Sequence, residues 1–225
     1  MNLAIIHPEG WRFVGIFSIM TIGLFFILPI LGWVGIILTL WCLYFFRNPT
    51  RITPDRYGLI VSPADGKVVA IQHSVPPPEW DIGTEPRVRI SIFLNVFDVH
   101  LNRIPIAGHV RKVIYHAGKF FNASLDKASE HNERNTVILD LNQQQNMAVT
   151  QIAGLIARRI RCDVTANEQV ETGQLFGLIR FGSRTDVYLP LGVEPLVIEG
   201  QRMLGGETIL ADLSSDEPAR YGIIR

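Results

Sequence analysis

The sequence predicts a mainly β protein of the α+β class, in which a β-sandwich-like or barrel-sandwich-like domain follows an N-terminal hydrophobic helical membrane segment. Residues 13–46 contain no charged side chain. After residue 54, apolar and polar side chains alternate with a period of two, and Gly and Pro recur at short spacing between these stretches. Helical patterns do not alternate with the strands, which excludes a doubly wound parallel sheet.

Charged residues are balanced in number but unevenly distributed. Lys plus Arg and Asp plus Glu both number 21, so the net charge is zero and a nucleic-acid partner bound by bulk electrostatics is excluded. Only Glu9 and Arg12 fall within residues 1–46, which leaves 40 of the 42 charged side chains in residues 47–225. The two cysteines form neither a disulfide framework nor a metal-ligand spacing. We therefore expect no metal site.

Residues 1–46 are predicted to form a hydrophobic membrane segment. The uncharged run from Phe13 to Phe46 has 34 residues, whereas about 20 apolar residues cross a bilayer as one helix. Pro29 and Gly32 lie near its middle, where a helix is most easily interrupted. The run fits either one long tilted span or a hairpin of two short helices. The shortness of each half favours the hairpin.

The sequence also predicts on which side of the membrane the rest of the chain lies. Arg47 and Arg51 follow the apolar run directly. Because cytoplasmic flanks of membrane segments are enriched in Lys and Arg, we expect attachment to the inner cell membrane with residues 47–225 facing the cytoplasm.

Strands are expected to build most of residues 47–225. In residues 87–100, the apolar side chains at positions 88, 90, 92, 94 and 96 share one face, and Asp98 and His100 would end that face if the strand persists. Only residues 123–134 suggest a loop with a helical turn. The other predicted strands are 58–62, 67–72, 109–115, 135–141, 147–152, 175–181, 185–189 and 207–211.

Some of these strands resemble those of a non-enzymatic type of protein. Segments such as SPADGKVVAI and VETGQLFGLI pair a short strand with a Gly turn and resemble biotinyl- or lipoyl-type β-sandwiches. One alternative is therefore a membrane-anchored adaptor or carrier protein of that type, without enzymatic activity. Against a carrier, no lysine occupies a Met-Lys-type turn. The sequence contains no GxGxxG, Walker or HExxH motif.

A second set of motifs carries a more specific resemblance. FFRNPTR, SPADGKV, the Asp98-Val99-His100 segment, DKASEHNERN, RFGSRTDVYLP and MLGGETILADL occur in this order from the hydrophobic leader to about residue 213. Together they resemble the phosphatidylserine decarboxylase proenzymes, and most closely the short bacterial and archaeal branch. The resemblance implies a carboxy-lyase that converts phosphatidylserine to phosphatidylethanolamine.

The resemblance also implies a covalent pyruvoyl cofactor made by self-cleavage between Gly182 and Ser183. Ser183 would attack the carbonyl of Gly182, and elimination would leave a β chain of residues 1–182 and an α chain of residues 183–225. The new N-terminal residue of the α chain would become the pyruvoyl group, which forms a Schiff base with the substrate amine. Glycine suits the cleavage position because it tolerates a strained backbone.

Three residues match the catalytic positions of the family. They are Ser183, the histidine of the Asp-x-His pattern at His100, and Asp65 as a triad aspartate that orients an imidazole. Many longer members carry a second histidine where this chain has Arg103. Either His100 serves both self-cleavage and decarboxylation, or another residue such as His109 or His116 activates the serine.

The implied partners are the phosphatidylserine substrate, membrane lipid, the α and β chains of one precursor, and a second copy in a homodimer. The cationic candidates for the lipid phosphate are Arg103, Lys119, Lys127 and Arg134. A soluble amino acid as the substrate is a further alternative. The sequence leaves open whether the lipid is ester- or ether-linked.

Overall fold

The computed structural model describes residues 5–118, 132–141, 145–154, 159–180 and 182–223. The chain divides into two compact units, residues 1–50 with 97–99 and residues 51–96 with 100–225. The helices are α1 (Pro8–Ile27), α2 (Pro29–Phe45) and the short 3-10 helix η1 (Pro78–Trp80). The strands are β1 (Leu59–Val61), β2 (Gly66–Ser74), β3 (Arg87–Leu94), β4 (Leu101–Arg103), β5 (Gly108–His116), β6 (Arg134–Asp140), β7 (Asn146–Ile152), β8 (Ile160–Cys162), β9 (Gln169–Val170), β10 (Leu175–Ile179), β11 (Ser183–Tyr188), β12 (Arg202–Met203) and β13 (Ile209–Asp212).

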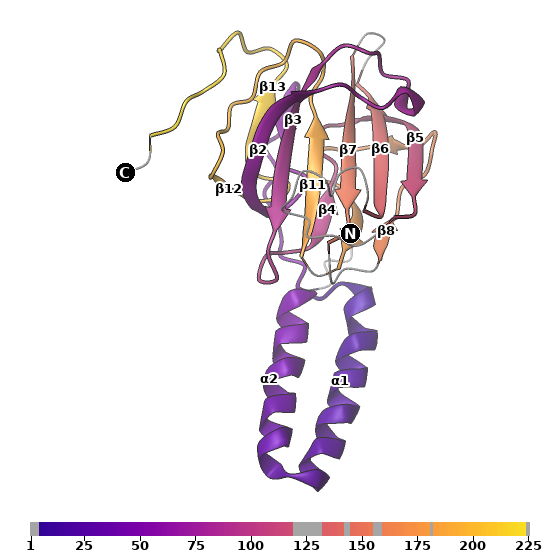
Figure 1. The fold of residues 1–225 in the computed structure, drawn as a ribbon, viewed down its shortest axis with the longest axis vertical. Helices are drawn as coiled ribbons and strands as arrows, with labels where there is room; N and C mark the ends of the chain where they lie inside the picture. The colour runs from indigo at the N-terminus through magenta and orange to yellow at the C-terminus, as the bar shows by residue number, and fades with distance from the viewer. Residues whose placement is uncertain (1–4, 119–131, 142–144, 155–158, 181, 224–225) are drawn as a thin grey trace. The chain divides into compact units, whose positions relative to one another are not determined.

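The first unit is a hairpin of two apolar helices, α1 and α2 (Figure 1). Leu28 separates them with φ −158° and ψ 124°, because a residue before proline is driven out of the helical region and Pro29 then starts the next helix. The hydroxyls of Thr21 and Thr39 lie 3.2 Å apart, so the helices pack side by side. By length and composition, α1 can cross a membrane, and α2 is a shorter apolar helix. The predicted interruption near Pro29 is confirmed.

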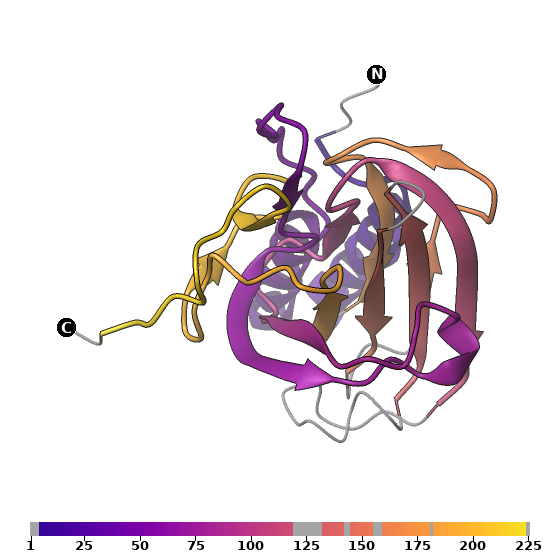
Figure 2. The same ribbon diagram turned by 90° about the horizontal axis from the view of Figure 1, so that it is seen from above.

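The second unit consists of antiparallel strands in three sheets. The largest has eight strands in the order β12-β2-β3-β11-β7-β6-β5-β9, and it curls (Figure 2). Smaller sheets, β4-β10-β8 and β1-β13, contribute residues such as Phe176 and Leu210 to the core that covers one face of the large sheet. The prediction of a mainly β chain with an N-terminal apolar helical segment is confirmed.

The observed strands overlap every stretch predicted from period-two alternation. The strands not predicted, β4, β8, β9 and β12, have only two or three residues each. Such short strands contain too few positions to display a period. The loop expected at 123–134 lies outside the described residues except for 132–134, where β6 begins.

The strand predicted from residue 87 does not persist to His100. The segment 87–100 does not continue as one strand, because β3 ends at Leu94 and Phe97–Val99 belong to the first unit. Asp98 therefore does not extend the face of β3, and His100 stands directly before β4. Both faces of β3 are largely buried, so its side chains are not divided into an inner and a solvent-facing row.

Candidate active site

The Gly182-Ser183 bond lies where the chain enters β11. Gly182 has φ +63°, in the left-handed region that favours glycine, and a Cβ built there would meet nothing within 4 Å. Ser183 is the first residue of β11 and pairs with Leu94 of β3. Its side chain is fully buried, and its hydroxyl has no hydrogen-bond partner among the described residues. A buried hydroxyl without a partner is unusual and costs folding free energy, which marks Ser183 as a functional candidate.

His100, directly before β4, contacts the residue on the N-terminal side of this bond. Its Nε2 accepts a hydrogen bond from the Gly182 N–H at 3.2 Å, and its carbonyl accepts one from the Ile179 N–H at 3.2 Å. As the acceptor of this hydrogen bond, Nε2 presents its lone pair toward the Gly182 N–H. The side chain is fully buried. An imidazole nitrogen therefore contacts Gly182, the residue before the serine that the sequence singled out.

Comparison with known proteins identifies the family. The sequence profile of the phosphatidylserine decarboxylase family matches residues 38–211. Proteins named phosphatidylserine decarboxylase proenzyme are similar along almost the whole chain: that of Cereibacter sphaeroides is 58% identical over 219 residues, covering 97% of this chain and 94% of the relative. The chain belongs to the phosphatidylserine decarboxylase family.

Two further relatives of the same name support this assignment to the phosphatidylserine decarboxylase family. The protein of Rhodospirillum rubrum is 55% identical over 221 residues, covering 98% of this chain and 94% of the relative. The protein of Ruegeria pomeroyi is 58% identical over 207 residues, covering 92% and 94% respectively. The resemblance inferred from the sequence motifs is thus confirmed.

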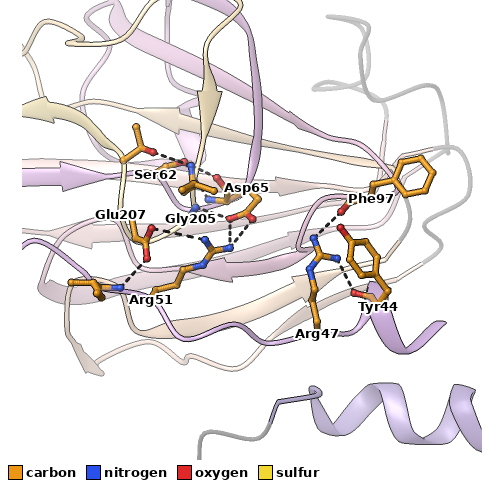
Figure 3. Close-up of polar contacts among 12 residues, drawn as sticks. Tyr44, Arg47, Arg51, Ser62, Asp65, Phe97, Gly205 and Glu207 are labelled. Carbon is orange, nitrogen blue, oxygen red and sulfur yellow. Dashed lines mark hydrogen bonds and ion pairs between the residues drawn. The ribbon is translucent and has the colours of Figure 1, made fainter. Parts of the chain in front are cut away.

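Asp65, the residue matched to the triad aspartate of the phosphatidylserine decarboxylase family, lies in a cluster of charged side chains (Figure 3). Its carboxylate accepts two hydrogen bonds from Nη2 of Arg51, at 2.9 and 2.7 Å, and one from the Gly205 N–H at 2.7 Å. Nη1 of Arg51 also lies 4.0 Å from the carboxylate of Glu207. These contacts hold Asp65 rigidly. An imidazole partner for it stays a prediction.

Arg103, which stands where longer members of the family carry a second histidine, lies in the same neighbourhood. Its Nη1 donates to the Gly173 carbonyl at 2.9 Å. Burial lowers the pKa of Arg103, the charge of Arg51 lowers it further, and Asp65 and Glu207 oppose the shift. Because a guanidinium stays protonated in proteins, Arg103 cannot replace a histidine as a base. The hydrogen bond to the Gly173 carbonyl indicates that Arg103 stabilises the local structure instead.

The other candidates are separated from Ser183. His109 and His116 lie on β5, and His116 is 3.6 Å from the carboxylate of Glu79. Arg134 lines a cavity of about 220 Å³ together with Asp186 of β11. Because side chains alternate along a strand, Asp186 lies on the sheet face opposite Ser183. Lys119 and Lys127 lie outside the described residues.

Residues that the sequence interpretation did not single out also surround the site. Arg51 follows the apolar run as a charge next to the membrane, yet its Nη2 also donates to both carboxylate oxygens of Asp65. Asn102 and Thr185 each follow a candidate, His100 and Ser183, by two residues, and their side chains are hydrogen bonded at 3.4 Å. The sequence carried no signal for Asn102, because it lies beyond the predicted strand 87–100 in a strand of three residues.

Proposed function

We propose that this chain is a proenzyme that cuts itself between Gly182 and Ser183 and decarboxylates phosphatidylserine to phosphatidylethanolamine with the resulting pyruvoyl group. The observation that carries the proposal is the combination at one bond of a left-handed glycine, a buried serine hydroxyl without a partner among the described residues, and an imidazole nitrogen that accepts a hydrogen bond from the glycine N–H. Relatives over 55% identity are named as proenzymes of this reaction, which supports the same substrate class.

The first step uses only groups of this chain. Ser183 Oγ attacks the Gly182 carbonyl carbon, which converts the peptide bond to an ester and transfers the acyl group from nitrogen to oxygen. A hydroxyl that is not hydrogen bonded can rotate into this attack, and Gly182 has no Cβ to obstruct it. His100 Nε2 contacts the N–H of Gly182, the residue before Ser183, and as a general base it can carry the hydroxyl proton to the Ser183 nitrogen.

The following steps balance without an external oxidant or reductant. Loss of the Ser183 Cα proton breaks the Cβ–Oγ bond and releases Gly182 as a new C-terminal carboxylate. The dehydroalanine left at position 183 takes up one water molecule, releases ammonia and becomes the pyruvoyl group. Its carbonyl supplies the electrophile that binds the substrate amine and accepts the electrons freed when carbon dioxide leaves.

The two fragments are held together after such a cut. The fragment 183–225 contributes β11, β12 and β13, which pair with β3, β7, β2 and β1 of the larger fragment. Asp212 forms an ion pair across the two fragments with Arg56. Hydrogen bonds from Ser214, together with Arg56, lower the pKa of Asp212 below its ordinary value, because they stabilise the carboxylate.

The helical hairpin suits a lipid substrate. Its exposed surface is apolar along both helices, which fits burial in the inner cell membrane. A hairpin returns both ends to one side of the membrane, and the arginines that follow it favour the cytoplasmic side. The proposed substrate and the anchor of the enzyme would then occupy the same bilayer.

The direct test is the intact mass of the purified full-length chain in detergent. We expect two masses, for residues 1–182 and for a shorter fragment that reacts with a carbonyl reagent and lacks a free α-amine. Ser183→Ala is the control and should give one mass. An adaptor or carrier protein would show a single uncut chain, and release of carbon dioxide from free serine instead of phosphatidylserine would indicate a soluble substrate.

A further inference from the structure

One row of side chains in the large sheet is polar, although the row beside it is apolar. Thr185 on β11 pairs with Gln151 on β7, which pairs with Asn135 on β6. Side chains alternate along strands, so this row shares the sheet face of Ser183. The next row on the same strands and face consists of Val187, Val149 and Val137.

Hydrogen bonds connect the polar row to the strand that follows His100. Gln151 Nε2 donates to Asn102 Oδ1 at 2.8 Å, and Asn102 Nδ2 donates to Thr185 Oγ1 at 3.4 Å. Asn135 Nδ2 donates to Gln151 Oε1 at 3.2 Å. All four side chains are at most 3% exposed.

Burying amides and a hydroxyl is costly even when they are paired, and valines fill the adjacent row at no such cost. The sheet itself therefore does not require polar side chains at this row. The structure also leaves room for them: a Cβ on Gly177 of β10 would lie 2.8 Å from Gln151 Nε2. A requirement other than packing is the physical explanation for the polar row.

The spacing of residues along the segments 100–102 and 183–185 indicates that requirement. Asn102 follows His100 by two residues, and Thr185 follows Ser183 by two residues. The Asn102–Thr185 hydrogen bond and the hydrogen bond from the Gly182 N–H to His100 Nε2 therefore join the same two segments at neighbouring levels. Gln151 Nε2, the group that donates to Asn102, also donates to the Arg161 carbonyl at 3.3 Å.

We propose that Asn102, supported by Gln151, and Thr185 are positioning residues that align His100 with the Gly182-Ser183 bond for self-cleavage. This inference rests on the proposed function, since it assigns residues to the same bond. None of the three side chains needs to touch the reacting atoms. Their effect is to fix the offset between the segment that carries the imidazole and the strand that carries the serine.

The test compares self-cleavage rates of the full-length chain made by cell-free synthesis in detergent micelles, followed on denaturing gels. Thr185→Val removes the hydroxyl with little change of shape, and we expect cleavage about 10- to 100-fold slower, the size of effect that follows from misplaced reacting groups. Thr185→Ser keeps the hydroxyl and should restore most of the rate. The matched control is Thr136→Val, which removes a buried threonine pair, Thr136 with Thr150 at 2.9 Å, on the opposite face of the same sheet.

Stability is measured separately in the uncut Ser183→Ala background. There Thr185→Val and Thr136→Val should lower the melting temperature by similar amounts, so a rate loss confined to Thr185→Val reflects positioning. The double variant Asn102→Leu/Thr185→Val should cleave no more slowly than Asn102→Leu alone. Cleavage of Thr185→Val at the parent rate, equal slowing by Thr136→Val, or additive slowing in the double variant would overturn the inference. A parent chain that stays uncut refutes the proposed function instead.

Discussion

Replacing Gly182 with alanine isolates the backbone conformation at the proposed cleavage bond. The alanine Cβ would meet no atom within 4 Å, so it introduces no clash. What remains is the cost of holding a residue with a Cβ at φ +63°, about 1–2 kcal/mol. If the reactive geometry needs this left-handed conformation, the same cost lowers its population by a factor of about 5 to 30, and self-cleavage should slow by that factor.

Gly192→Ala is a matched control for this prediction. Gly192 also has a left-handed φ, +77°, and open space around its missing Cβ, but it lies beyond β11. Urea unfolding in the Ser183→Ala background should show a similar loss of unfolding free energy for both alanine variants. Gel assays of the cleavable chains should show slowing only for Gly182→Ala. Cleavage of Gly182→Ala at the parent rate, despite the same loss of stability, would refute the claim that the left-handed turn is required.

Three other changes test separate parts of the molecule. His100→Ala should slow both self-cleavage and decarboxylation by about 10²–10⁴-fold, as expected for loss of a general base. Arg103→Ala should still be cut, because a guanidinium accepts no proton. Normal cleavage of His100→Ala on gels would move the activating role to another residue. Deleting residues 1–46 should shift the protein from the membrane pellet to the supernatant, and a truncated chain that still pellets in high salt would show that another surface is the anchor. Because the folded pKa of Asp212 is depressed, its carboxylate stabilises the fold fully above the unfolded pKa of about 3.9, and this stabilisation is lost as the pH falls through the lower folded pKa. The difference in unfolding free energy between the parent and Asp212→Asn should therefore narrow below about pH 4. A difference that is constant from pH 3 to 7 would contradict this.

The elements predicted best are those whose signal is local. The uncharged run, its interruption at Pro29 and the longer strands follow from residue type and period, which need no distant contact. The short strand β4 could not be predicted, because three residues show no period. Whether the strand persists to His100 could not be predicted, because parity alone does not reveal where a strand loses its partner.

The candidate site shows the same difference between local sequence signals and contacts that depend on the fold. Resemblance to the family was enough to single out Ser183, His100 and Asp65 in the sequence. For Asp65, however, a motif in one segment could not reveal that Arg51 and Gly205 hold its carboxylate. Gly205 is 140 positions away in the chain, and only folding brings its N–H to the carboxylate.

By itself, then, the sequence determined the apolar segment, the β-rich remainder, the family and the bond at which to look for chemistry. The tertiary structure alone decided that the His100 imidazole meets the Gly182 N–H, 82 residues away, and that Asn102 is hydrogen bonded to Gln151 and Thr185 of the buried polar row. Periodicity records which face of a strand a residue occupies. Strand order and register decide which faces meet, and they arise from the packing of the whole sheet, because a shift of one residue would turn every side chain to the other face.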